Sequence, residues 1–252
     1  MNKTLAIQPV DALSAAWCDA DVVVTSVMEA MSFVTPALER FLVQSVARQL
    51  PEQPELRERC RDFIREESRH RRMHALLNSS LLDYLRVPPL GLAHAESILA
   101  WARTSLSAAS QLRLVAASEH LTAVLSKQYL ARSVRWTFTS RSAKAVFDSH
   151  AHDELRHRSV AFDLCADAGS AGRVSRGLAL ASVVLGAALY LVIASPSILR
   201  RKTGQGFVRC LGRVIRRAAG NLPEARGLAS ELIHFAREGY HPRSLVQGTE
   251  SA

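Results

Sequence analysis

Apolar residues recur at the three- and four-residue spacing of amphipathic helices along most of the chain, whereas alternating apolar and polar runs are scarce. The pattern predicts an all-α protein. The main predicted helices cover residues 37–49, 55–82, 105–135 and 142–168, with a short helix near 94–104. Thr35 and Pro36 are predicted as the N-cap and first position of the first helix. Residues 22–33 are either a separate helix or the near side of a proline kink.

The last third of the chain has a different character. Residues 177–195 carry no charge and precede Pro196, which is predicted to end this helix. A basic helix over 207–219 and a final helix over 223–238 follow. The run from 178 to 195 is near the lower limit of roughly 17–25 residues for crossing a bilayer, and it equally suits a helix buried against the bundle. We predict two domains, a four-helix bundle over 1–172 and an apolar and basic helical extension over 173–252, packed on the bundle or on a membrane surface.

Charge and cysteine content narrow the classes of function. The net charge is +9, but residues 173–252 hold 12 Lys and Arg against 4 Asp and Glu, so nearly all the excess lies in the extension. Because this segment lacks clustered aromatics or a reading motif, nucleic acid is not an expected partner. Four dispersed cysteines without a C-x-x-C pair and the lack of a secretory signal predict a cytoplasmic protein, and the apolar and basic extension is compatible with a peripheral position on the inner membrane face.

Acidic and histidine side chains recur in a pattern that suits metal binding. Glu67 and Glu154 each precede a histidine by three residues, His70 and His157, and two other helices offer single glutamates, Glu39 and Glu119. Residues i and i+3 share one face of a helix. The order Glu, Glu-x-x-His, Glu, Glu-x-x-His is the ligand plan of ferritin-like di-iron and di-manganese bundles. The sequence therefore predicts two iron ions, with manganese compatible and zinc less favoured.

Two of these glutamates also have explanations that do not involve a metal. Glu67 lies in a densely charged segment, residues 62–72, which would also suit a solvated face with i,i+4 ion pairs. Glu119 lies among apolar residues, where a carboxylate needs a partner, and an ion pair with Arg113 or Arg156 is the alternative to a metal.

Two further histidines extend the ligand faces. His150 lies four residues before Glu154, and His74 lies four after His70. Each is predicted either as an additional ligand or catalytic group, or as a hydrogen-bond partner of the ligands. For His74 the second role is favoured; for His150 both stay open.

The chain resembles a bacterial family known as predicted metal-dependent hydrolases. The resemblance rests on residues 36–41, 63–70 with His74, 117–120, 150–157 continuing into 160–163, and a closing motif at 240–242. The chain departs from the family where Glu66 replaces Gln and Asp153 replaces Glu, and residues 147–149 lack a Trp. The spacing of His150, Glu154 and His157 is more distantly similar to di-iron arylamine N-oxygenases, which implies a third histidine ligand.

These observations predict a ferritin-like four-helix bundle with a helical C-terminal extension. The leading functional hypothesis is a di-iron enzyme that activates dioxygen to oxidise a small or lipid-like substrate. The alternatives are a hydrolase using a bridging hydroxide and an iron-storage or sensor protein without substrate. Expected partners are a small or hydrophobic substrate, dioxygen and an anionic membrane surface, and a homodimer is compatible. The substrate and the choice between oxidation and hydrolysis are not determined by the sequence.

Overall fold

The computed structural model describes residues 13–19, 21–220 and 222–245. Within these residues it contains helices and no strand, apart from an isolated bridge between Cys18 and Phe138, so the all-α prediction is confirmed. The helices are α1 (Val22–Ala47), α2 (Pro54–Leu85), α3 (Leu92–Ser105), α4 (Ala108–Ser133), α5 (Arg141–His157), α6 (Val160–Asp167), α7 (Arg173–Thr203), α8 (Phe207–Ala219) and α9 (Leu222–His234), followed by a 3₁₀ turn, η1 (Pro242–Leu245).

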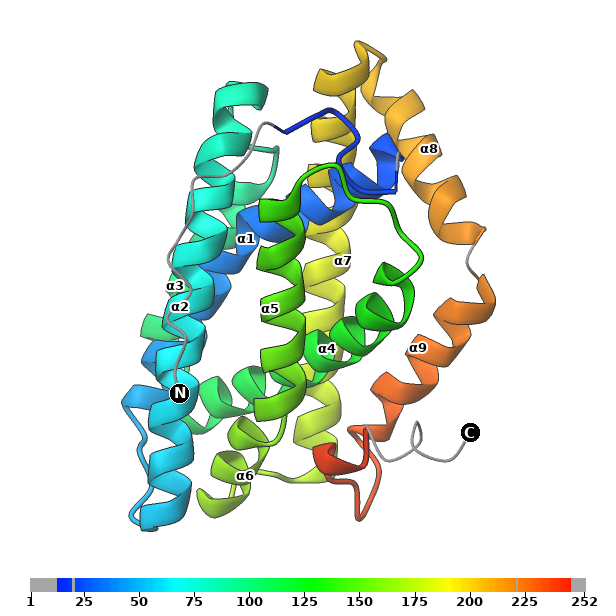
Figure 1. Cartoon of the computed structure of the whole chain (residues 1–252). Helices are drawn as coiled ribbons and strands as arrows, with labels where there is room; N and C mark the ends of the chain where they lie inside the picture. The colour runs from blue at the N-terminus through cyan, green and yellow to red at the C-terminus, as the bar shows by residue number, and fades with distance from the viewer. Residues whose placement is uncertain (1–12, 20, 221, 246–252) are drawn as a thin grey trace.

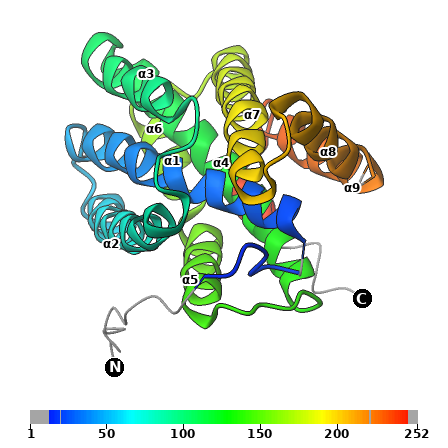
Figure 2. The same ribbon diagram turned by 90° about the horizontal axis from the view of Figure 1, so that it is seen from above.

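The four helices that carry the predicted ligands pack around one another. α1 packs along α2, α4 packs along α5, and contacts of α1 with α4 and of α2 with α5 close the ring. α7 lies against α1 and α4, and α8 packs beside α7 (Figures 1 and 2). The core has two large apolar clusters, and on α1 and α2 the ligand positions lie between the residues of one cluster and those of the other. The predicted site therefore lies as a buried polar layer between them.

Helix α1 is continuous through Pro36, so the prediction that a helix begins at Thr35 and Pro36 is wrong. The N-cap is Asp21, whose side chain accepts hydrogen bonds from the first turn. The Thr35 hydroxyl instead donates to a carbonyl one turn earlier. Proline has no N–H for the carbonyl of residue 32, and Asn78 Nδ2 on α2 donates to this Ser32 oxygen at 2.9 Å. A neighbouring helix thus supplies the missing hydrogen bond and keeps α1 intact.

The predicted helix over 142–168 is interrupted, and this prediction needs correction. α5 ends at His157 and α6 begins at Val160. Between them, the Arg158 guanidinium donates to the carbonyl of Leu155 and to the carbonyl of Pro242 at 3.0 Å. One side chain therefore satisfies a carbonyl at the end of α5 and ties this end to η1.

Helix α7 continues through Pro196 to Thr203, so the predicted end at Pro196 is also wrong. Residues 194–199 are all buried, and this packing offsets the roughly 3 kcal/mol that an interior proline costs. The helix ends at Gly204, with φ of 69°. Two described helices, α1 and α7, are long and apolar enough to cross a membrane by length and composition, a test that core helices of water-soluble proteins also pass. Half of the apolar window of α1 is buried in the protein, against 22% for α7.

Candidate metal centre

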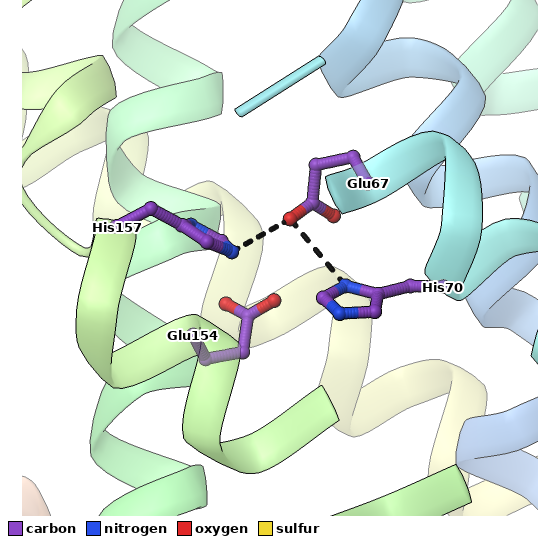
Figure 3. A group of neighbouring side chains, drawn as sticks. All are labelled: Glu67, His70, Glu154 and His157. Carbon is purple, nitrogen blue, oxygen red and sulfur yellow. Dashed lines mark ion pairs between the residues drawn. The ribbon is translucent and has the colours of Figure 1, made fainter. Parts of the chain in front are cut away.

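The two Glu-x-x-His segments meet where α2 faces α5. One ligand atom from each of Glu67, His70, Glu154 and His157 lies within 4.8 Å of the others. Glu67 Oε1 is 2.9 Å from His157 Nε2 and 3.5 Å from His70 Nδ1 (Figure 3). All four side chains are buried, so the alternative that Glu67 lies on a solvated face is wrong. The i,i+3 spacing brings both members of each pair to the same point between the helices.

A second group adjoins the first and shares one histidine with it. Glu39 from α1 and His150 from α5 lie with His70 so that their ligand atoms are within 4.8 Å of one another. His150 Nδ1 is 3.5 Å from Glu39 Oε1, and its Nε2 is 3.2 Å from Glu154 Oε1. The rings of His70 and His150 stack with centroids 4.5 Å apart. Two neighbouring cations could therefore be held by one continuous set of side chains.

Glu119 on α4 lies outside both groups and contacts the first through His157. Its Oε2 is 3.0 Å from His157 Nδ1, and the residue has no exposed surface. The alternative ion pair with Arg113 or Arg156 is wrong, because Arg113 donates to a backbone carbonyl and Arg156 binds two other carboxylates. The partner of Glu119 is instead His157, which also contacts Glu67.

Two of the carboxyl groups are held in an environment that opposes their charge. Burial, and then the carboxylates of Glu67 and Glu154, raise the pKa of Glu39 well above its ordinary value. Burial, followed by the charge of Glu154, likewise raises the pKa of Glu119. Like charges so close together in the interior need a compensating cation.

The histidines partly supply that positive charge when they are protonated. Burial disfavours an imidazolium at His70, but the neighbouring carboxylates of Asp153 and Glu67 outweigh it and raise the pKa of His70 to about 9. The same competition, with Glu119 and Glu67 as partners, raises the pKa of His157. Burial also opposes ionisation of Glu67, but the imidazoles of His157 and His70, 2.9 and 3.5 Å from its Oε1, hold its pKa below the usual value. Without metal, the protons on His70 and His157 therefore compensate part of the negative charge of the carboxylates.

Several ligand atoms have no hydrogen bond among the described residues, although they are buried. These atoms are Glu39 Oε1 and Oε2, Glu67 Oε1 and Oε2, Glu119 Oε1, His70 Nδ1 and His157 Nε2. Unsatisfied buried polar atoms are rare in folded proteins and cost about 1–3 kcal/mol each, more when charged. Four carboxylates with imidazole nitrogens form a donor set suited to iron, manganese or zinc. The residues present therefore fit a metal site.

Asp153 is a functional residue that sequence reasoning noted only as a departure from the family. Its Oδ2 lies 2.9 Å from His70 Nε2, and Arg69 and Arg156 both bind the carboxylate. A hydrogen bond from Nε2–H to Asp153 leaves Nδ1 of His70 free to face the cluster. This carboxylate–histidine arrangement is the usual way in which proteins orient metal-binding imidazoles. The signal in the sequence is its place next to Glu154, with i,i+3 spacing to Arg156.

A hydrogen-bonded chain orients His150 from behind. Asn78 Nδ2 donates to the Ser32 carbonyl, so its Oδ1 accepts from the Ser32 hydroxyl at 2.7 Å. The hydroxyl proton is thereby used, and Ser32 Oγ accepts from His74 Nδ1 at 2.9 Å. Burial, and then the positive charge of His150 and His70, lower the pKa of His74 well below its usual value, so the ring is neutral. Its Nε2 accepts from His150 Nδ1 at 3.2 Å, which leaves Nε2 of His150 as the ring nitrogen that faces Glu154.

This chain separates the two histidines whose roles the sequence left open. His74 lies in neither metal-binding group and acts as the hydrogen-bond partner of His150. His150 belongs to the second group, and its side chain is 17% exposed, more than Glu39, Glu154 or His157, which are at most 5% exposed. His150 therefore marks the side from which solvent reaches the cluster. Thr122, which the sequence analysis did not single out, donates to Glu154 Oε2 at 2.5 Å.

Comparison with known proteins supports a metal-binding role for this cluster. A protein-family model described as "Predicted metal-dependent hydrolase" matches residues 3–245. No curated protein and no solved structure matches the chain. The family match spans nearly the whole sequence and includes each residue of the cluster. The likeness to di-iron arylamine N-oxygenases has no counterpart among these findings.

Proposed function

The chain belongs to the family of predicted metal-dependent hydrolases, and on that premise we propose that it is a di-metal hydrolase acting on a carbonyl or phosphoryl substrate. The observation that carries this proposal is the buried cluster of glutamate and histidine ligand atoms without hydrogen bonds. When bound, two divalent ions supply a water of lowered pKa and polarise the group under attack.

The residues of the chain divide into those that hold the ions and those that orient the ligands. Seven side chains would hold the ions: Glu39, Glu67, His70, Glu119, His150, Glu154 and His157. Asp153 fixes which nitrogen of His70 faces the cluster, and His74 does the same for His150. Because His150 is the most accessible of the histidines that reach the cluster, it marks the side from which a substrate would approach the ions.

We extend the proposal to fold family and organisation. The ring formed by α1, α2, α4 and α5 supports a ferritin-like bundle over residues 1–172. Residues 173–252 would form the extension, of which α7 lies against α1 and α4. Iron remains the metal we expect, with manganese next.

Metal analysis combined with a hydrolysis assay tests the proposal. The full chain would be stripped with a chelator, reloaded with Fe(II), Mn(II) or Zn(II), and assayed with aryl esters and aryl phosphates. We expect two ions per chain, and metal-dependent hydrolysis, in the parent protein and in Lys127→Ala, a control on the same helix as Glu119. Glu119→Ala and Glu154→Ala should lower metal occupancy and reduce hydrolysis to the metal-free background.

Two outcomes would contradict the proposal. Full metal content in both glutamate variants at limiting metal would show that the cluster is not the binding site. Two ions per chain without hydrolysis of any carbonyl or phosphoryl probe would argue for storage, sensing or oxygen chemistry instead.

Oxygen activation is the second candidate, and the position of His150 favours it. A third imidazole beside the carboxylates adds a nitrogen donor to the second group. Stopped-flow spectra of the anaerobic Fe(II) protein mixed with dioxygen would test this candidate. A transient absorption that changes in His150→Ala is the expected result, and a protein whose spectrum does not respond to dioxygen would rule the candidate out.

A further inference from the structure

Helix α7 exposes an apolar face that no described part of the chain covers. Leu178, Leu185 and Leu189 are 66%, 61% and 56% exposed, although they are large hydrophobic residues. Residues 177–199 include no charged side chain. The exposed face runs from Val174 to Ile193, about 28 Å at the 1.5 Å rise of an α-helix. A solvent-exposed apolar face of this length indicates that a partner covers it.

Positive charge borders this face at both ends. Arg173 precedes it and Arg200 follows it, and both are exposed. At the Arg200 end an open hollow of about 470 Å³ is lined by Leu90, Ser197, Arg200, Arg201 and Gly204. The adjoining helix α8 adds exposed arginines, of which Arg209 lies near the same end. The surface thus combines an apolar strip with cations and a recess of headgroup size.

The opposite face of α7 is fixed to the protein. The Tyr190 hydroxyl donates to the Ala30 carbonyl of α1 at 2.9 Å, and Arg176 Nε donates to the Phe235 carbonyl at 2.9 Å. Lys202 Nζ forms a buried ion pair with Glu29 at 2.7 Å. Crossing a bilayer would break these contacts and place Arg176 in hydrocarbon. The geometry therefore suits a helix that lies in the plane of a membrane surface.

We propose that α7 and the exposed arginines of α8 dock this protein on an anionic phospholipid bilayer, with the leucines of α7 among the acyl chains and Arg200 and Arg209 at the phosphates. A second copy of the chain would complement the charge of this surface less well than anionic lipid does. α7 and α8 contain no Asp or Glu, so neither helix offers a carboxylate to the arginines of another molecule. Lipid phosphates provide that negative charge. Figure 2 shows α7 on the side of the molecule away from α2 and α5.

Vesicle flotation of the full chain tests this docking. The probes are phosphatidylcholine vesicles with and without 30 mol% phosphatidylglycerol, at low and at physiological salt. We expect binding that requires phosphatidylglycerol and weakens with salt. Arg200→Gln with Arg209→Gln should weaken it roughly 25-fold, about fivefold per arginine. Leu185→Gln with Leu189→Gln should abolish vesicle binding, because it removes two of the leucines that would enter the acyl chains. Both side chains are exposed, so the double variant should keep the fold.

Leu76→Gln is the matched control, since Leu76 is an exposed leucine on α2, at 42%. This variant should float like the parent, and all variants should keep the parent's circular dichroism and melting temperature. Absence of binding to anionic vesicles, or binding that the α7 variants do not change, would overturn the proposal. So would a dimer in light-scattering measurements that Leu185→Gln with Leu189→Gln converts to monomer, because a second copy would then occupy the face. Vesicle binding is measured independently of metal content, so its outcome does not depend on the proposed hydrolase activity.

Discussion

Replacing Glu39 by glutamine separates metal binding from folding. Both carboxylate oxygens of Glu39 are buried and lack hydrogen bonds, and burial, followed by the charge of the neighbouring carboxylates, raises its pKa. Glutamine keeps the shape and removes the charge. We therefore expect Glu39→Gln to stabilise the metal-free protein and to weaken its affinity for metal. If Glu39 had only a structural role, the metal-free Glu39→Gln protein would be less stable than the parent.

The size of the effect follows from the burial of this carboxyl. A buried charged group without a partner costs about 1–3 kcal/mol or more. Keeping one carboxyl protonated at pH 7, when its ordinary pKa is 4.5, costs at most about 3.4 kcal/mol. We expect a gain near 2 kcal/mol, or roughly 4–8 °C in melting temperature for a chain of this size. Because the pKa of Glu39 is raised, its carboxyl is least destabilising below pH 4.5, and the advantage of glutamine should grow as the pH rises above that value.

The assay is thermal unfolding with chelator and with metal. In the parent, metal at 100 times its dissociation constant should add about 2.7 kcal/mol. If the variant binds about 10–100-fold more weakly, the same metal concentration should add less than about 1.5 kcal/mol. Glu58→Gln, at an exposed position on α2, should change neither value. A metal-free Glu39→Gln protein that melts below the parent, with an unchanged metal shift, would refute the reasoning.

Three further predictions follow from the contacts of the cluster and of α7. Metal affinity should rise up to about tenfold per pH unit as the pH approaches 9, because a bound metal displaces the proton of His70, and metal-free stability should fall over the same range; affinity that is flat between pH 7 and 9 in calorimetric titrations would contradict this. Ser32→Ala should lower the melting temperature, because it leaves His74 Nδ1 and Asn78 Oδ1 buried without a partner, and should change the Co(II) spectrum of the loaded protein, since the chain that orients His150 is broken; an unchanged spectrum would remove that role. Lys202→Met should cost about 3–5 kcal/mol by leaving Glu29 buried and unpaired, and adding Glu29→Gln should restore most of it in denaturant titrations; full stability of the single variant would show that the pair contributes nothing.

The helical content and the ligand faces could be predicted because they depend on local periodicity. The i,i+3 spacing within α2 and α5 decides that Glu67 and His70 share a face, and the same holds for Glu154 and His157. The chain order of the four helices then limits how these faces can meet. That they hold metal stays a prediction.

The parts that could not be predicted depend on contacts between helices. The partner of His70 is Asp153 from another helix, and no spacing within α2 indicates it. Pro36 and Pro196 were misread as helix boundaries, because the local cost of a proline is offset by packing that only the folded chain reveals. The role of Asn78 was hidden for the same reason.

Pro36 also fixes how far α1 and α2 can slide along each other. The carbonyl it leaves without an N–H is matched by a single amide, that of Asn78, so a shift by one helical turn would leave both groups unsatisfied in the interior. Glu39 lies one turn beyond the proline, and Glu67 about three turns before the asparagine. An apparent defect in α1 thereby fixes the positions of two carboxylates on different helices relative to each other along the helix axes.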